Sequence, residues 1–132
     1  MINTFKILFI LLALCKALFS QTNIQTLQPQ EDFENILVQK IYSDTMGTGF
    51  VIWVKNNVKA HKHLNHTEHL YILEGECKMR LGDNFIQMKV GDYIVIPQGT
   101  VHSVEEVLSE SSLKVLSIQT PEFDGTDRVL IE

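Results

Sequence analysis

The sequence predicts an all-β fold, a sandwich or a barrel, made of a single domain. Three observations indicate this. Short runs of apolar and β-branched residues recur along the chain, turns rich in Gly, Pro and Asn separate them, and no segment after residue 20 has the apolar period of an amphipathic helix. The 132 residues suffice for one modest core. An active site must therefore lie inside one fold rather than in a cleft between domains.

Residues 1–20 have the pattern of a secretory signal peptide. Lys6 precedes an unbroken apolar run that ends at Cys15, and the small residue Ser20 stands at the expected cleavage point. We expect an exported protein, periplasmic or secreted. No stable membrane span is expected in the mature chain, because Lys16 interrupts a run that would need roughly 18 apolar residues to span a bilayer. An uncleaved N-terminal anchor and a lipid anchor at Cys15 are the alternatives.

The charge balance argues against two classes of partner. The whole chain has 11 basic and 16 acidic side chains and a net charge of −5. Without residues 1–20 the counts are 9 and 16, a net charge of −7, and no run of Lys or Arg occurs. Such a chain offers no electrostatic footprint for nucleic acid or an anionic membrane surface. We therefore expect no nucleic-acid partner.

Along the chain, residues 21–34 are polar and predict a flexible N-terminal arm, and residues 35–132 form the predicted barrel domain. Only residues 31–38 could start a short helix, and their β-branched end argues against it. The expected strands are 36–42, 50–54, 70–73, 77–81, 85–90, 93–96, 101–104 and 113–119.

Cys77 is the only cysteine after residue 20, so no disulfide within the mature chain is expected. It alternates with Met79 and Leu81 along one predicted strand. This pattern favours a buried small hydrophobic residue over a nucleophile.

Four of the five histidines lie within nine residues, from His61 to His69. Side chains two apart in a strand share a face, so His61 and His63 can bind one metal ion. A turn after His63 can bring Glu68 to the same centre. Imidazole and carboxylate together suit Fe, Mn, Ni, Cu or Zn rather than calcium. A polar loop that happens to be rich in histidine is the alternative for this cluster alone.

A second segment, from Gly91 to His102, supports the metal interpretation. Together the two segments resemble the two signature motifs of the cupin superfamily, of the small single-domain bacterial type, and the resemblance is strongest over residues 55–106. Lys55 and Glu106 stand where the motifs have Gly and Asn, at positions of structure rather than of metal binding. The positions that match the motifs are His61, His63, Glu68 and Gly75 in the first, and Gly91, Pro97, Gly99 and His102 in the second.

The resemblance implies a cupin-type jelly-roll barrel with His61, His63, Glu68 and His102 directed onto one divalent transition metal. It also implies a metal-dependent enzyme that acts on a small oxygenated substrate, with dioxygenase, isomerase and lyase chemistry all open. The alternative is a non-catalytic cupin module that binds a metal or a small ligand in the cell envelope. A homodimer is expected as well, because pairing with a second copy hides the edge strands of a small jelly roll.

Two further histidines have different expected roles. Alternation from Glu68 places His69 on the face opposite the metal, together with Tyr71 and Leu73, where it would serve packing or a subunit contact. His66 lies in the turn between the predicted ligands. It is a candidate catalytic residue as a proton carrier at the cavity mouth, and an exposed loop histidine is the alternative interpretation.

Overall fold

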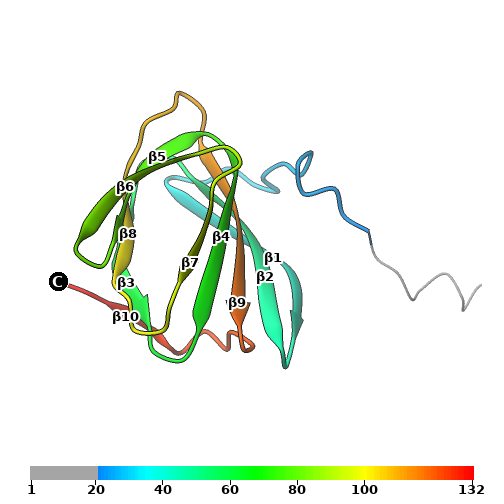
Figure 1. Cartoon of the computed structure of the whole chain (residues 1–132). Helices are drawn as coiled ribbons and strands as arrows, with labels where there is room; N and C mark the ends of the chain where they lie inside the picture. The colour runs from blue at the N-terminus through cyan, green and yellow to red at the C-terminus, as the bar shows by residue number, and fades with distance from the viewer. Residues whose placement is uncertain (1–20) are drawn as a thin grey trace, which may run out of the picture.

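The computed structural model describes residues 21–132, so the predicted signal segment 1–20 lies outside the described residues. The described chain is all β, as expected, with two antiparallel sheets of five strands each (Figure 1). Within residues 21–132 no helix is long and apolar enough to cross a membrane. The strands are β1 (Ile36–Asp44), β2 (Gly47–Val54), β3 (Val58–His63), β4 (Thr67–Glu74), β5 (Glu76–Leu81), β6 (Asn84–Lys89), β7 (Tyr93–Ile96), β8 (His102–Val107), β9 (Leu113–Thr120) and β10 (Arg128–Leu130).

The strand order is that of a jelly roll. The first sheet runs β1-β2-β9-β4-β7 and the second β10-β3-β8-β5-β6, so strands distant in sequence, such as β2 and β9, pair directly. The inner faces of the two sheets enclose the core, because alternate residues of each strand point inward. The buried core residues are Val54, Leu70, Ile72, Ile96, Leu113 and Val115 from the first sheet, and Cys77, Met79 and Met88 from the second.

Cys77, the cysteine that lies after residue 20, is buried, as the sequence predicts. Its side chain is 1% exposed and belongs to the core cluster. Burial raises the pKa of its thiol to about 11, with a smaller contribution from the charge of Glu76. The thiol therefore stays protonated at neutral pH and is a poor nucleophile.

Two of the strands, β3 and β10, are not among those predicted from the apolar runs of the sequence. β3 alternates histidines and small residues with lysines, and β10 is only three residues long, so neither forms a recognisable hydrophobic run. The short helix considered at residues 31–38 is absent, because Ile36 already begins β1 and pairs with Val54 of β2. Pairing along the whole of β1 satisfies the backbone groups that a helix would otherwise have satisfied.

The predicted arm, residues 21–34, contains no strand and is attached to the outer face of the first sheet. The ammonium of Lys114, on β9, donates hydrogen bonds to the carbonyl oxygens of Gln25 at 3.0 Å and Leu27 at 2.7 Å. It also lies 5.7 Å from the centre of the Trp53 ring. Lys114 is 1% exposed and Trp53 4%, so the attached arm buries this part of the outer face.

The turn between β4 and β5 requires glycine. Gly75 has a φ of +81°, and a Cβ at this position would lie 2.8 Å from Ser109 Oγ and 3.1 Å from Leu113 Cα. Both the left-handed backbone and the close approach exclude a larger residue. This glycine closes the first motif, and it brings β4 into position beside β9.

Candidate metal site

Three buried histidines meet on the inner face of the second sheet. His61 and His63 are the alternate inward residues of β3, and His102 begins β8 directly opposite His61 in the antiparallel ladder. One ring nitrogen of each lies within 4.8 Å of the other two. Their side chains are 7%, 4% and 3% exposed. His102 therefore lies beside the two histidines of β3 that the sequence predicts as metal ligands.

Hydrogen bonds fix the same tautomer on all three rings. Nδ1 of His61 lies 2.8 Å from the carbonyl oxygen of Lys59, and Nδ1 of His102 lies 3.0 Å from that of Thr100. Nδ1 of His63 faces the Asp127 carboxylate at 3.2 Å. Carbonyl and carboxylate oxygens accept only, so each Nδ1 carries the proton. Nε2 of each ring is therefore the nitrogen available to a metal ion, which is the arrangement of metal-binding imidazoles.

The histidines fit a divalent metal on two further observations. Nε2 of His102 is buried and forms no hydrogen bond with residues 21–132, although Oε2 of Glu68 lies 3.1 Å away, and such a buried nitrogen is costly unless something outside the chain binds it. Burial, followed by the charge of His102, lowers the pKa of His61 to about 4. The His61 ring is therefore neutral at physiological pH, as a ligand must be. The three histidines could hold one metal ion.

Glu68 lies beside the histidines with one oxygen held and the other directed at them. Its Oε1 accepts hydrogen bonds from Ser117 Oγ at 2.5 Å and Gln119 Nε2 at 3.3 Å, both on β9. Its Oε2 lies 3.1 Å from Nε2 of His102 and 3.8 Å from Nε2 of His63. Burial opposes ionisation, but contacts with His102 and Ser117 outweigh it and lower the pKa of Glu68. The carboxylate is therefore charged and lies beside His63 and His102.

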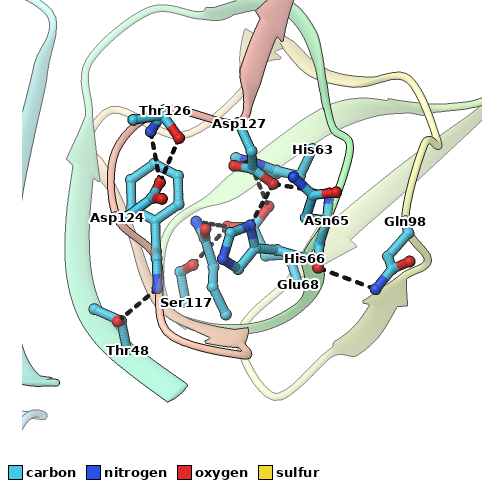
Figure 2. A network of polar contacts seen from close by, with 12 residues as sticks. Thr48, His63, Asn65, His66, Glu68, Gln98, Ser117, Asp124, Thr126 and Asp127 are labelled. Atoms are coloured by element: carbon cyan, nitrogen blue, oxygen red, sulfur yellow. Dashed lines mark hydrogen bonds and ion pairs between the residues drawn. The ribbon is translucent and has the colours of Figure 1, made fainter. Parts of the chain in front are cut away.

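Asp127 is the site residue that the sequence analysis did not identify. It lies just before β10, is 4% exposed, and accepts hydrogen bonds from His63 and His66 (Figure 2). Its Oδ2 also accepts from the backbone N–H of Asn65 at 3.0 Å. No motif includes this position, because the contact depends on the C-terminal segment folding back over the histidine turn.

His66 is buried and 4% exposed, so the alternative of an exposed loop histidine is wrong. Nδ1 of His66 donates to Asp127 and Nε2 donates to the carbonyl oxygen of Glu122 at 2.7 Å. Two acceptors require two ring protons, so His66 is an imidazolium paired with the Asp127 carboxylate. Burial opposes this charge, but the bonds to Asp127 and Glu122 outweigh it and raise the pKa of His66. His66 thus ties the C-terminal segment to the turn between β3 and β4.

His69 faces away from the site, as alternation predicts. Its ring stacks on Tyr93 of β7, and its Nδ1 lies 2.6 Å from the tyrosine hydroxyl. Alternation also places Tyr71 and Leu73 on this outer side. Tyr71 is 39% exposed, as expected there, but Leu73 is buried, with 4% of its side chain exposed. A register shift in β4 between Ile72 and Glu74 accompanies this difference.

The turn between β7 and β8, which belongs to the second motif, forms hydrogen bonds with the chain at His63 and Asn65. Gly99, with a φ of +75°, donates its backbone N–H to the carbonyl oxygen of His63 at 2.7 Å. Gln98 donates from Nε2 to the carbonyl oxygen of Asn65 at 3.0 Å (Figure 2). The corner between β7 and β8 therefore holds the chain at His63, while β8 supplies His102.

A cavity of about 140 Å³ extends from the histidines into the barrel. Its polar end includes His61, Glu68, His102 and Arg128, and its walls are almost entirely apolar. Ile36 and Val38 of β1 also line it and are 39% and 52% exposed, so the opening lies beside this edge strand. The site is therefore the interior of the barrel, as the length of the chain predicts.

Comparisons with known proteins agree with this geometry. The family model for the cupin domain matches residues 50–119. An uncharacterized protein of Aquifex aeolicus is 31% identical over 99 residues, which cover 75% of this chain and 80% of that protein. Quercetin 2,3-dioxygenase of Bacillus subtilis is 36% identical over 66 residues, 50% of this chain but only 19% of the dioxygenase. The structure of Pac13, described as a nucleoside dehydratase, has a TM-score of 0.59 at 14% identity and covers 72% of this chain and 85% of its own. Pac13 is a Streptomyces protein.

Proposed function

This chain belongs to the cupin family, and we propose that it is a mononuclear metal-dependent enzyme that acts on a small oxygenated substrate inside the barrel. One observation carries the proposal. The three clustered histidines all have Nδ1 bonded to an acceptor, so Nε2 of each ring is the nitrogen available to one metal ion, and that of His102 is buried without a hydrogen bond. A purely structural histidine cluster has no need to leave such a buried nitrogen without a partner.

Within this proposal Glu68 is the fourth ligand, through Oε2. Ser117 and Gln119 hold the other oxygen, which orients the carboxylate toward His63 and His102. A divalent ion such as Fe, Mn, Ni, Cu or Zn bound there would supply Lewis-acid chemistry, and with iron or manganese also dioxygen chemistry. The chain's own part is to orient the ligands and to exclude bulk water with the apolar walls.

Metal analysis of the purified protein tests the site. We expect about one equivalent of a transition metal in the wild type, loss of most of it in His102→Ala, and weaker retention in Glu68→Gln. His69→Ala is the matched control, because it removes a histidine of the same segment that faces Tyr93 instead of the cavity. Equal metal content in His102→Ala and His69→Ala would contradict the assignment, as would a wild type that binds no metal at neutral pH.

Three reaction types are candidates, and they differ in the observations that support them. The local similarity to quercetin 2,3-dioxygenase supports dioxygenase chemistry, and the fold similarity to the dehydratase Pac13 supports a lyase. Isomerase chemistry uses the same Lewis-acid property. Oxygen uptake by the iron- or manganese-loaded protein with a panel of small oxygenated acids separates the first from the others. Bound zinc alone would weaken the dioxygenase proposal.

The second candidate function is a non-catalytic cupin module that binds a metal or a small ligand in the cell envelope. The composition of the cavity supports it, because an apolar chamber with a few converging polar groups is also the form of a binding site. If His102→Ala loses the metal and every ligand-dependent property of the cell is unchanged, the enzyme proposal should be abandoned in favour of this one.

We also propose that the protein is exported. The pattern of Lys6, the apolar run that ends at Cys15, and Ser20 supports cleavage after residue 20. Mass spectrometry of the protein from its native cell should find a mature N-terminus at Gln21. An N-terminus at Cys15 carrying lipid would indicate the lipoprotein alternative, and an intact N-terminus would indicate an uncleaved anchor.

A homodimer is proposed through the outer face of the first sheet. Tyr71, Tyr93, Val95 and Ile118 lie on neighbouring strands of this face and are 39% to 59% exposed. An exposed apolar patch of this kind favours association. Sedimentation at micromolar concentration should give a dimer for the wild type and a monomer for Ile118→Lys. Phe85→Lys, on the second sheet, should stay dimeric, and a monomeric wild type would refute the proposal.

A further inference from the structure

The cavity is amphipathic, with all its charge at one end. His61, Glu68, His102 and Arg128 line the polar end. The opposite walls are formed by buried apolar side chains, among them Val54, Leu70, Ile72, Cys77, Met79 and Leu113. Its volume of about 140 Å³ is close to that of an engineered apolar cavity of about 150 Å³ that binds benzene. The chamber therefore accepts a molecule with an apolar body of about one six-membered ring.

Arg128 lies at the rim of this chamber because of its position in β10. It lies directly opposite His63 in the antiparallel ladder with β3, and Leu130 lies opposite His61 (Figure 1 shows β10 beside β3). Directly opposed residues of antiparallel strands project from the same face of a sheet. Arg128 therefore shares the face of His61 and His63, but its side chain is exposed and lines the chamber at its mouth.

Within residues 21–132 the guanidinium of Arg128 has no anionic partner, since none of the ion pairs at 4.0 Å or less includes it. Glu68 is the one carboxylate that lines the cavity, and its contacts are with Ser117, Gln119 and the histidines. The five N–H donors of Arg128 are thus available at the opening of the chamber.

We propose that Arg128 is a specificity-determining residue that binds the carboxylate of a small monoanionic ligand, whose apolar body of about one ring fills the chamber behind it. This inference rests on the proposed function in one respect, which is that the ligand binds inside the chamber. A guanidinium matches a carboxylate with two parallel hydrogen bonds, whereas an ammonium does not. A single guanidinium and a chamber of this size favour a carboxylate over a phosphate, which has more acceptor oxygens to satisfy.

Binding of benzoate and of its neutral analogue benzyl alcohol tests the proposal by calorimetry on the full mature chain, once loaded with zinc and once stripped by a chelator. We expect the wild type to prefer benzoate. Arg128→Gln should weaken benzoate binding by roughly 10- to 100-fold, the value of a charge-assisted hydrogen bond, and leave benzyl alcohol binding unchanged. Arg128→Lys should recover only part of the loss, because it keeps the charge but not the planar fork.

Lys62→Gln is the matched control. It removes one positive charge from β3 next to the site, but Lys62 pairs with Val129 and projects from the opposite face. It should bind benzoate like the wild type, and thermal unfolding should verify that every variant is folded. No preference for benzoate, no binding at millimolar concentration, or equal losses in Arg128→Gln and Lys62→Gln would each overturn the proposal.

The two arms separate this inference from the metal proposal. If the protein binds no metal but the stripped protein binds benzoate in an Arg128-dependent manner, the metal proposal fails and the carboxylate site stands. If the protein binds one metal ion and benzoate binding does not depend on Arg128, the metal proposal stands and this inference fails.

Discussion

The carboxylate of Asp127 accepts a hydrogen bond from Nδ1 of His63 at 3.2 Å, across 64 residues of sequence. The same carboxylate holds His66 and the backbone of Asn65. One acidic side chain of the C-terminal segment therefore orients a candidate metal ligand and also secures the turn that follows it. Substitution of such a partner of a metal-binding histidine typically weakens metal binding by roughly 10- to 100-fold.

Asp127→Asn should weaken metal binding by about 10- to 100-fold, because the amide is a poorer acceptor for His63 and removes the counter-charge of His66. Competition with a chelator measures the effect. Asp124→Asn is the matched control, since Asp124 is exposed and bonds only within its own turn to Thr126. Equal metal affinities of the two variants would refute a role for Asp127 in orienting His63.

The ion pair of His66 and Asp127 predicts a pH window for stability. The pKa of His66 is raised above its ordinary value of 6.5, so the stabilisation by its charged form is full below about pH 6.5 and is lost as pH rises through the folded-state pKa. The pKa of Asp127 is lowered below 3.8, so its contribution is present above that value and is lost as pH falls through the folded-state pKa. The pair therefore stabilises most between about pH 4 and 6.5.

Urea unfolding of the wild type and of His66→Gln, with a chelator present, measures this window. The difference in the free energy of unfolding should be largest near pH 5.5 and should shrink toward pH 9. His69→Gln should show no such profile, because its ring contacts Tyr93 on the outer face. A difference for His66→Gln that stays constant from pH 5 to pH 9 would rule out a charged pair.

Gly75→Ala should destabilise the fold by about 2 to 4 kcal/mol. The left-handed conformation costs a residue with a Cβ roughly 1 to 2 kcal/mol, and the contacts with Ser109 Oγ and the Leu113 backbone add overpacking. Gly82→Ala is the matched control, with a φ of +58° and no atom within 4 Å of the added Cβ. It should lose only the conformational part, about 1 kcal/mol in urea unfolding. Equal losses would show that the crowding at Gly75 relaxes freely.

Lys114→Met should release the N-terminal arm. The change keeps most of the side-chain volume but removes the donor that binds the carbonyl oxygens of Gln25 and Leu27, each bond being worth roughly 1.5 to 3 kcal/mol. Limited proteolysis should then cleave within residues 21–34 faster than in the wild type. Lys89→Met, at an exposed position of β6, should leave the cleavage rate unchanged. An arm that is equally protected in Lys114→Met would contradict the assigned attachment.

Much of the fold follows from local pattern. The apolar runs of β2, β4, β5 and β9 alternate or are continuously hydrophobic, and glycines mark the turns between them, so the all-β class and the buried state of Cys77 are visible in the sequence. β3 and β10 are not visible in the sequence, because the buried positions of β3 are occupied by histidine and β10 has only three residues, none of them buried. A strand that carries a functional site loses the hydrophobic signal by which strands are recognised.

The sequence alone determined the fold class and the chemistry of the candidate site, since the spacing of His61, His63, Glu68 and His102 within two local motifs is a property of neighbouring residues. Only the tertiary structure decided which groups surround them. It placed Asp127 behind His63, fixed His66 as a buried cation, and brought Arg128 to the mouth of the cavity. These contacts join segments about 60 residues apart through the pairing of β10 with β3, and no local periodicity encodes a pairing at that distance.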